Sequence, residues 1–330
     1  MSLIDDLVKD YLINANGEKK KFELPNNIKL NGIENFLKGV SFIFDLEGTK
    51  TKNYILDLSH IKKTNVLGML LIYKVLEFTV KKKCFHRPVI AYEPYISNSW
   101  SKYGFISLIN AYIESSDTSK ELLEMNINIT DHFIIAPQPL IRVNNFSNNF
   151  LKSTFLPKLN EYYQGKSKVV SMISTCFSEI LLNFWEHAVD DTESVMIADG
   201  REQFIEIACA DTGNGIISTL KKNKNYTNLT GIELIKMCIN KDITSKEGTN
   251  HMGYGLWIIN EICRSVKGRF HLYSEGFCYI LDKDKVIVKE VPYWKGTIVY
   301  LALPLSNPIS LEDISSLAKY KETDFKVAFI

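Results

Sequence analysis

The sequence predicts an α/β protein of two domains, and three observations support this fold class. The chain has 330 residues, which is enough for two domains that each bury a sizeable core. Short apolar runs typical of strands alternate with helical patterns through the first half, which favours βαβ units over a mostly parallel sheet. In the second half, helices precede a series of short strands whose tight connections require antiparallel hairpins.

The first domain is predicted over residues 1–150. In chain order, its elements are the strand NYILDLS, the helix VLGMLLIYKVLEFTVKKK, the strand PVIAYEP, the helix WSKYGFISLIN and the strand HFIIAP. The Asn-rich stretch VNNFSNNF that follows is typical of a turn or loop, and it places the domain boundary near residue 150.

The second domain is predicted over residues 151–330. A helix is expected from about Lys168 to Val189, because apolar residues recur there at the 3, 4 and 7 spacings of a buried face. Later elements are the strand FIEIACAD, the helix GLWIINEICRSV and the strands RFHLYSE, FCYILD, KVIVKEV and TIVYLALPL. Residues 217–252 are polar around the short helical run GIELIKMCI, and we expect this long excursion to be a mobile lid.

Composition limits the classes of function. With 39 basic and 38 acidic residues the net charge is +1, so no overall field favours nucleic acid or an acidic membrane surface. The six cysteines occur singly and without zinc-type spacing, which indicates reduced thiols and a cytoplasmic location. The start MSLIDDLVKDYL lacks the pattern of a signal peptide, and the longest apolar run, VLGMLLIY, is too short to cross a bilayer.

The helical segment EILLNFWEHA contains three polar residues, Glu179, Asn183 and His187, at intervals of four. On an α-helix such residues project from one narrow stripe. The helix alone favours the ordinary explanation, in which the stripe is the solvated edge of a surface helix. Motifs later in the chain favour a binding role instead.

Two glycine motifs follow the long helix. The strand FIEIACAD runs into DTGNGI, where Gly213 and Gly215 allow a sharp turn and close approach of a ligand, and Asp211 offers a carboxylate. The segment HMGYGLWI then places Gly253 and Gly255 before a helix, whose unpaired N–H groups suit a phosphate. Each motif alone is a weak signal, since either could be only a tight connection.

A third motif, KGTIVYLALPL, opens the last strand with Gly296 and Thr297. In this order, an E-x-x-x-N helix, DxGxG at a strand end, a polar lid, GxGL before a helix and GT at a final strand resemble the GHKL ATP-binding fold. That family includes sensor histidine kinases, anti-sigma-factor serine kinases, DNA gyrase B, mismatch-repair ATPases and a large heat-shock chaperone. The resemblance covers roughly residues 160–305 and implies a Bergerat α/β sandwich, with a mixed sheet covered by helices on one face.

The resemblance implies a site for ATP and Mg²⁺. Asn183 matches the asparagine whose amide oxygen binds Mg²⁺ at the phosphates, in line with the preference of Mg²⁺ for hard oxygen ligands. Glu179 matches the catalytic carboxylate that orients or deprotonates the attacking group in the family's ATPases and serine kinases. Asp211 matches the aspartate that accepts a hydrogen bond from the adenine amino group, and Thr297 matches a threonine that approaches adenine.

Further residues complete the implied site. Those implied to contact nucleotide are, at the base, Gly213, Gly215 and Ile216 and, at the phosphates, Gly253, Gly255 and Leu256. His187 matches a histidine of anti-sigma kinases and some sensor kinases, and a structural or nucleotide-contact role is favoured over catalysis. Thr249, Asn250 and His251 precede the second glycine motif and are either phosphate contacts or exposed loop residues.

One departure from the sensor-kinase pattern is Glu186, where many sensor kinases carry Lys or Arg. The phospho-acceptor histidine of such kinases lies on a helix pair, whereas His60, His86 and His132 fall in strand, loop or edge contexts. A self-phosphorylating histidine kinase is therefore disfavoured. The E-x-x-x-N carboxylate favours serine kinase or ATPase chemistry.

The first domain resembles the STAS domains of anti-sigma-factor antagonists, over LDLSHI and KTNVLGMLLIYKVLEF. Thr64 or Asn65 occupies the position of their phosphorylated Ser or Thr, and Lys63 replaces the usual preceding Asp. The resemblance implies a STAS-like regulatory domain without a working acceptor. The alternative is a generic α/β domain that packs against the second domain.

Three functions are compatible with these motifs. The first is a signalling protein that binds Mg-ATP and slowly hydrolyses it to switch an interaction with a protein partner. The second is a protein serine/threonine kinase of the anti-sigma-factor type, and the third is a nucleotide-binding scaffold without turnover. No nucleic acid or membrane partner is expected, and assembly as a homodimer stays open.

Overall fold

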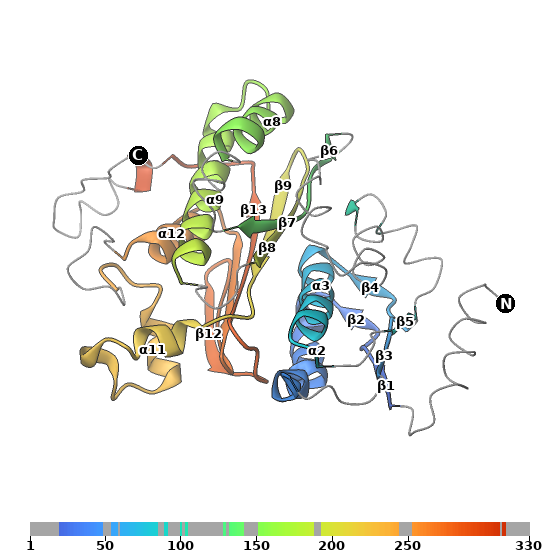
Figure 1. Cartoon of the computed structure of the whole chain (residues 1–330). Coiled ribbons are helices and arrows are strands. Elements are labelled where there is room, and N and C mark those ends of the chain that lie inside the picture. The colour runs from blue at the N-terminus through green and yellow to red at the C-terminus, as the bar shows by residue number, and fades with distance from the viewer. Residues whose placement is uncertain are drawn as a thin grey trace.

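A large antiparallel sheet and a small parallel sheet organise the chain, with helices between and beside them (Figure 1). The α/β class is thus confirmed. The computed structural model describes residues 20–48, 54–58, 60–84, 89–91, 100, 103–104, 128–129, 132–141, 151–187, 193–243, 253–310 and 312–314. Among these residues, no helix is both long and apolar enough to cross a membrane.

The first half contains the small sheet, whose strands lie in the order β1-β3-β5 and pair in parallel. Its strands are β1 (Lys20–Glu23), β3 (Tyr54–Asp57) and β5 (Val89–Ala91). A separate parallel pair is formed by β2 (Asn27–Ile28) and β4 (Lys63–Thr64). The helices of the first half are η1 (Leu30–Gly32), α2 (Ile33–Val40), η2 (Ser41–Leu46) and α3 (Val66–Lys81). The parallel strands and α3 agree with the predicted βαβ pattern, while most of WSKYGFISLIN lies outside the described residues.

Helix α3 is buried on nearly all sides, because it lies between the two sheets (Figure 1). A helix that is apolar all round is expected in such a central position. It shares a core with buried residues of α2 and η2, and it contacts β8 (Glu193–Gly200) and β9 (Phe204–Ala210) of the large sheet. The first half is therefore one layer of the whole molecule, here called the N-terminal layer (residues 20–91).

The large sheet has eight strands in the order β12-β11-β10-β13-β9-β8-β7-β6. The strands not yet introduced are β6 (Asn128–Ile129), β7 (Phe133–Ile141), β10 (Arg269–Ser274), β11 (Phe277–Asp282), β12 (Lys285–Glu290) and β13 (Thr297–Pro304). Every neighbouring pair in this sheet is antiparallel. The expected mixed sheet is therefore wrong. Hairpins account for the pairs β6–β7, β8–β9, β10–β11 and β11–β12, and the pairs β7–β8, β9–β13 and β10–β13 join strands that are far apart in sequence.

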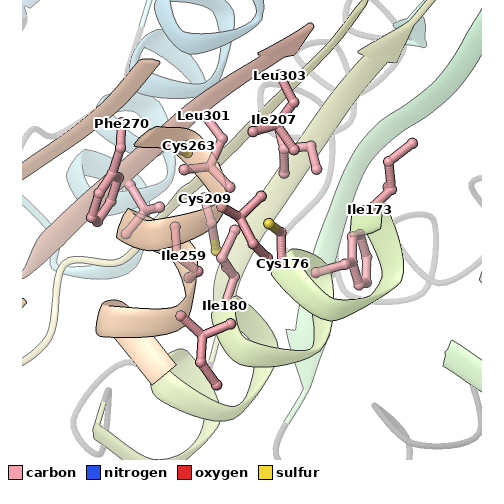
Figure 2. Packing of buried hydrophobic residues seen from close by; sticks show 14 of the residues in the cluster. Ile173, Cys176, Ile180, Ile207, Cys209, Ile259, Cys263, Phe270, Leu301 and Leu303 are labelled. Atoms are coloured by element: carbon pink, nitrogen blue, oxygen red, sulfur yellow. The ribbon is translucent and has the colours of Figure 1, made fainter. Parts of the chain in front are cut away.

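Both faces of the large sheet are covered, which corrects the expectation of helices on one face only. Helices α9 (Ser167–His187) and α12 (Gly255–Ser265) cover one face, and α3 covers part of the other. Alternate residues of β9 divide between the two cores: Ala208 and Ala210 face the N-terminal layer, and Ile207 and Cys209 face α9 and α12. Figure 2 shows the core on the second face, where side chains of α9, α12 and the strands pack together.

The segment predicted as a lid is largely folded in its described part, residues 217–243. It contains α10 (Ile216–Leu220), η5 (Lys224–Tyr226) and α11 (Gly231–Met237). Thr230 and Glu233 form a reciprocal cap at the start of α11, and Leu234 and Ile235 are buried in the core. Only residues 244–252 of the predicted lid lie outside the described residues.

The elements on either side of residue 150 agree with the prediction only in part. A π-helical turn (Leu151–Phe155) and α8 (Leu156–Tyr162) precede α9, which agrees with the helical start expected after residue 150. Strand β8 was absent from the prediction, and β7, expected from HFIIAP, pairs with β8 in the large sheet. The boundary near residue 150 thus stays a prediction, although the large sheet already includes two strands before it.

Candidate functional site

The polar stripe of α9 lies against the first residue of α12. A Cβ added at Gly255 would lie 2.7 Å from Oε2 of Glu179 and 2.9 Å from Nδ2 of Asn183. Nδ2 of Asn183 also donates a hydrogen bond of 2.8 Å to the backbone carbonyl of Glu179. This bond assigns the amide nitrogen to the helix backbone, so Oδ1 is the atom of Asn183 that would bind a cation.

The start of α12 has the features of an anion-binding helix end. α12 has 11 residues, and within the described part of the chain its N-cap residue, Tyr254, makes no side-chain cap. The first N–H groups of a helix have no partner within it, and its dipole favours negative charge there. Gly255 therefore places anion-binding N–H groups directly beside Glu179 and Asn183. Leu256, the next residue, is partly buried against the core.

The residues just before 244 and just after 252 contact one another. Gly253 has a φ of +67°, and a Cβ there would lie 2.5 Å from the backbone oxygen of Ile243. Nζ of Lys241 lies 5.3 Å from the ring centre of Tyr254. Burial, with a hydrogen bond to Asp242, raises the pKa of Tyr254 to about 12, so its hydroxyl stays protonated at neutral pH.

Asp211 and Gly296 form a second contact between two motifs. Asp211 is only 2% exposed, and its Oδ1 accepts a hydrogen bond of 2.8 Å from the backbone of Gly213. Its backbone N–H donates to the carbonyl of Thr297 over 3.0 Å. Gly296 has a φ of +90°, and a Cβ there would lie 2.3 Å from Oδ1 of Asp211. The structure thus joins the motifs DTGNGI and KGTIVYL, which are remote in sequence.

Ser274 contacts both of these motifs, and the motif pattern did not indicate it as a site residue. Its fully buried hydroxyl accepts a hydrogen bond of 2.8 Å from the backbone of Ile216 and donates one of 2.9 Å to the carbonyl of Gly296. Its Oγ also lies 3.5 Å from Oγ1 of Thr297, its register partner on β13. A small polar residue at the end of the predicted strand RFHLYSE was the only available signal.

Glu275 is a further residue that the motifs did not indicate. A Cβ at Gly215 would lie 2.3 Å from its Oε2, which also accepts a hydrogen bond of 2.8 Å from the backbone of Ser218. Gly215 is thus needed because the Glu275 carboxylate occupies the space beside it. This contact fixes the start of α10 against the hairpin that joins β10 and β11.

The α9–α12 contact and the Asp211–Gly296 contact both border one packed core. The side chains of Ile180, Cys209 and Ile259 share the packed cluster of Figure 2. Ile180 lies between Glu179 and Asn183 in sequence, and Cys209 lies two residues, or roughly 7 Å of strand, before Asp211. The α9–α12 contact and the Asp211–Gly296 contact therefore border one region of the molecule.

Several predicted residues lie outside what the structure describes. His187 ends α9, but its side chain and that of Glu186 belong to the undescribed part, as do Thr249, Asn250 and His251. The six cysteines are all buried as reduced thiols, as the sequence predicted. Burial raises the pKa of Cys176, Cys238 and Cys263, which keeps these thiols protonated and unreactive.

No protein-family model and no curated protein matches this chain.

Proposed function

We propose that the second half of the chain binds Mg-ATP in the manner of GHKL domains. The observation that carries the proposal is the contact of Glu179 and Asn183 with Gly255, because it brings a carboxylate and an amide to an anion-binding helix end. The Asp211–Gly296 contact adds support, since it places a buried carboxylate beside the turn DTGNGI. These two contacts bring the four motifs together in two pairs, which supports the proposal.

Each residue has a role in this proposal. Oδ1 of Asn183 would hold Mg²⁺, which when bound neutralises charge on the phosphates. The N–H groups at the start of α12 would bind phosphate oxygens. The buried Asp211 would accept a hydrogen bond from the adenine amino group, and Glu179 would orient or deprotonate the attacking water or hydroxyl.

For the reaction, we favour slow ATP hydrolysis that switches an interaction with a partner protein. Transfer to Thr64 within one chain is disfavoured by position. Asn65, beside Thr64, contacts Glu206 on the face of β9 opposite the one covered by α9, with 3.4 Å between Nδ2 and Oε1. The large sheet therefore separates Thr64 from Glu179. Serine/threonine kinase activity on a separate protein is the second candidate, favoured by the same Glu179–Gly255 contact.

For the N-terminal layer, a STAS-like fold stays a proposal, supported by the parallel order of β1, β3 and β5. Asn65 caps α3 by accepting a hydrogen bond of 3.2 Å from Gly68, so it already has a structural role at the position where STAS domains carry their acceptor. This supports a regulatory layer without a working phospho-acceptor.

The test is incubation of the full chain with Mg²⁺ and γ-labelled ATP, followed by separation of free phosphate from labelled protein. Calorimetry with a non-hydrolysable ATP analogue measures binding separately. Released phosphate supports hydrolysis, label on an added partner supports kinase activity, and binding without either supports the scaffold. Absence of nucleotide binding would overturn the proposal.

A further inference from the structure

The three residues before Gly296 all contact the N-terminal layer. The ring of Trp294 lies 5.2 Å from that of Phe44 in η2, at an interplanar angle of 81°, which is a favourable edge-to-face geometry. The ring of Tyr293 lies 6.0 Å from the same phenyl ring. Nζ of Lys295 lies 2.6 Å from the carboxylate of Glu47. This tripeptide, residues 293–295, is therefore held by the N-terminal layer through all of its side chains.

Trp294 also reaches the predicted base pocket. Its indole N–H donates a hydrogen bond of 2.9 Å to the backbone carbonyl of Asp211, and only 1% of its surface is exposed. The backbone N–H of Asp211 is held by the carbonyl of Thr297. Both backbone polar groups of Asp211 are thus bonded to the short segment that begins at Trp294.

These contacts connect η2 directly to Asp211, whose carboxylate would accept a hydrogen bond from the adenine amino group. Residues packed in this way transmit a displacement because protein cores are dense. A shift of Phe44 changes the room available to the Trp294 ring, and a shift of the indole N–H moves its bond to Asp211. Trp294 alone thus links Phe44 to Asp211, without any further residue between them.

We infer that Trp294 is a positioning residue for base recognition, and that the N-terminal layer sets its position through Phe44. The inference rests on the proposed nucleotide site. It adds that selectivity for adenine depends on the first half of the chain, which lies on the opposite face of the sheet from α9. Nucleotide binding and the state of the N-terminal layer are therefore coupled, and by linkage each affects the other equally.

The test compares ATP with ITP, in which a carbonyl oxygen replaces the adenine amino group. An Asp211 carboxylate held in place favours ATP, because it accepts a hydrogen bond from the amino group and repels the carbonyl. In Trp294→Phe, which keeps an aromatic ring and removes the N–H, we expect the ratio of ATP to ITP affinity to fall on the order of tenfold. Phe44→Leu should lower the ratio in the same direction.

Tyr300→Phe is the matched control, because it also removes one hydrogen bond of a buried aromatic residue, from Tyr300 to Glu206, on the face toward the N-terminal layer. This variant should lose stability and keep the wild-type ratio. If Trp294→Phe does not fold, incorporation of benzothienylalanine at position 294 keeps the ring shape and replaces the N–H by sulfur.

Each outcome decides between the two proposals. A wild-type chain that binds ATP, together with folded position-294 variants of unchanged selectivity, overturns this inference and leaves the proposed function standing. A wild-type chain that binds neither nucleotide overturns both. A fall in the ratio in Tyr300→Phe as well would assign the effect to general loss of stability and overturn the role of Trp294.

Discussion

Glu179 and Gly255 meet at the crossing of two helices, where a carboxylate oxygen lies 2.7 Å from the point that a Cβ at position 255 would occupy. The two residues are 76 positions apart (255 minus 179) and no local pattern links them. Their contact depends on α9 and α12 packing over the same strands. It makes Gly255 the residue on which the geometry of the site depends most directly.

In Gly255→Ala, we expect binding of Mg-ATP to weaken by at least tenfold, measured by calorimetry. The added methyl group would displace the Glu179 and Asn183 side chains, whose ends are its nearest neighbours. Because these are side-chain ends, the fold can yield, and the melting temperature should change little. Gly39→Ala is the control, since that helical glycine in α2 has no other atom within 4 Å of its added Cβ. It should be neutral or slightly stabilising and leave binding unchanged.

In Glu179→Ala, we expect turnover to be abolished while ATP still binds. The reason is that the proposed role of this carboxylate concerns the attacking group and not the nucleotide. Phosphate release reports turnover and calorimetry reports affinity. A variant that loses ATP binding as well would contradict the assignment of Glu179 as the base.

The pair Gly296→Ala and Gly276→Ala separates backbone strain from crowding. Both glycines have a positive φ, +90° and +89°, so either substitution should cost about 1–3 kcal/mol of the free energy of unfolding. At Gly276 the nearest atom to an added Cβ is 3.7 Å away, whereas at Gly296 the Asp211 carboxylate lies at 2.3 Å. Gly296→Ala should therefore lose more stability and also lose ATP binding. Chemical denaturation of both variants measures the difference, and equal losses would contradict the close Asp211–Gly296 contact.

His271 predicts a loss of stability in acid. Burial lowers its pKa from 6.5 to about 4, and among the described residues its Nε2 has no hydrogen-bond partner. The unfolded chain therefore binds a proton more readily than the folded one. The stabilising contribution of neutral His271 is complete above pH 6.5 and is lost as the pH falls toward 4. From pH 7 to pH 5 this amounts to about 2 kcal/mol.

The measurement is urea denaturation of wild type and His271→Leu at both pH values. The variant should lose about 2 kcal/mol less than wild type on acidification, by the same linkage. An unchanged dependence in His271→Leu would assign the acid sensitivity to other groups.

The sequence predicted those elements whose pattern is local. The helix of α9 follows from its apolar spacing, and the strands β9 to β13 follow from short apolar runs with turns between them. Strand β8 was missed because Val195, Met196, Ile197 and Ala198 are all buried, so the alternation that identifies a half-exposed strand is absent. The two covered faces of the sheet are the physical reason for that missing alternation.

The residues of the candidate site likewise divide into those with a local sequence pattern and those without one. Motif order predicted Glu179, Asn183, Asp211 and Gly255, since glycines and polar residues in apolar surroundings stand out in a sequence. Ser274 and Trp294 could not be found in that way. Ser274 acts through its register opposite Thr297, and Trp294 acts through one N–H that reaches Asp211. Neither contact leaves a pattern along the chain.

The position of α3 between the two sheets has a consequence for how the chain unfolds. The helix shares one core with α2 and η2 and with β8 and β9 of the large sheet, so neither half can lose structure without exposing apolar surface of the other. Calorimetric melting should then give one cooperative transition instead of two. A fragment that starts at residue 151 would lack both α3 and β7, and we expect it to aggregate.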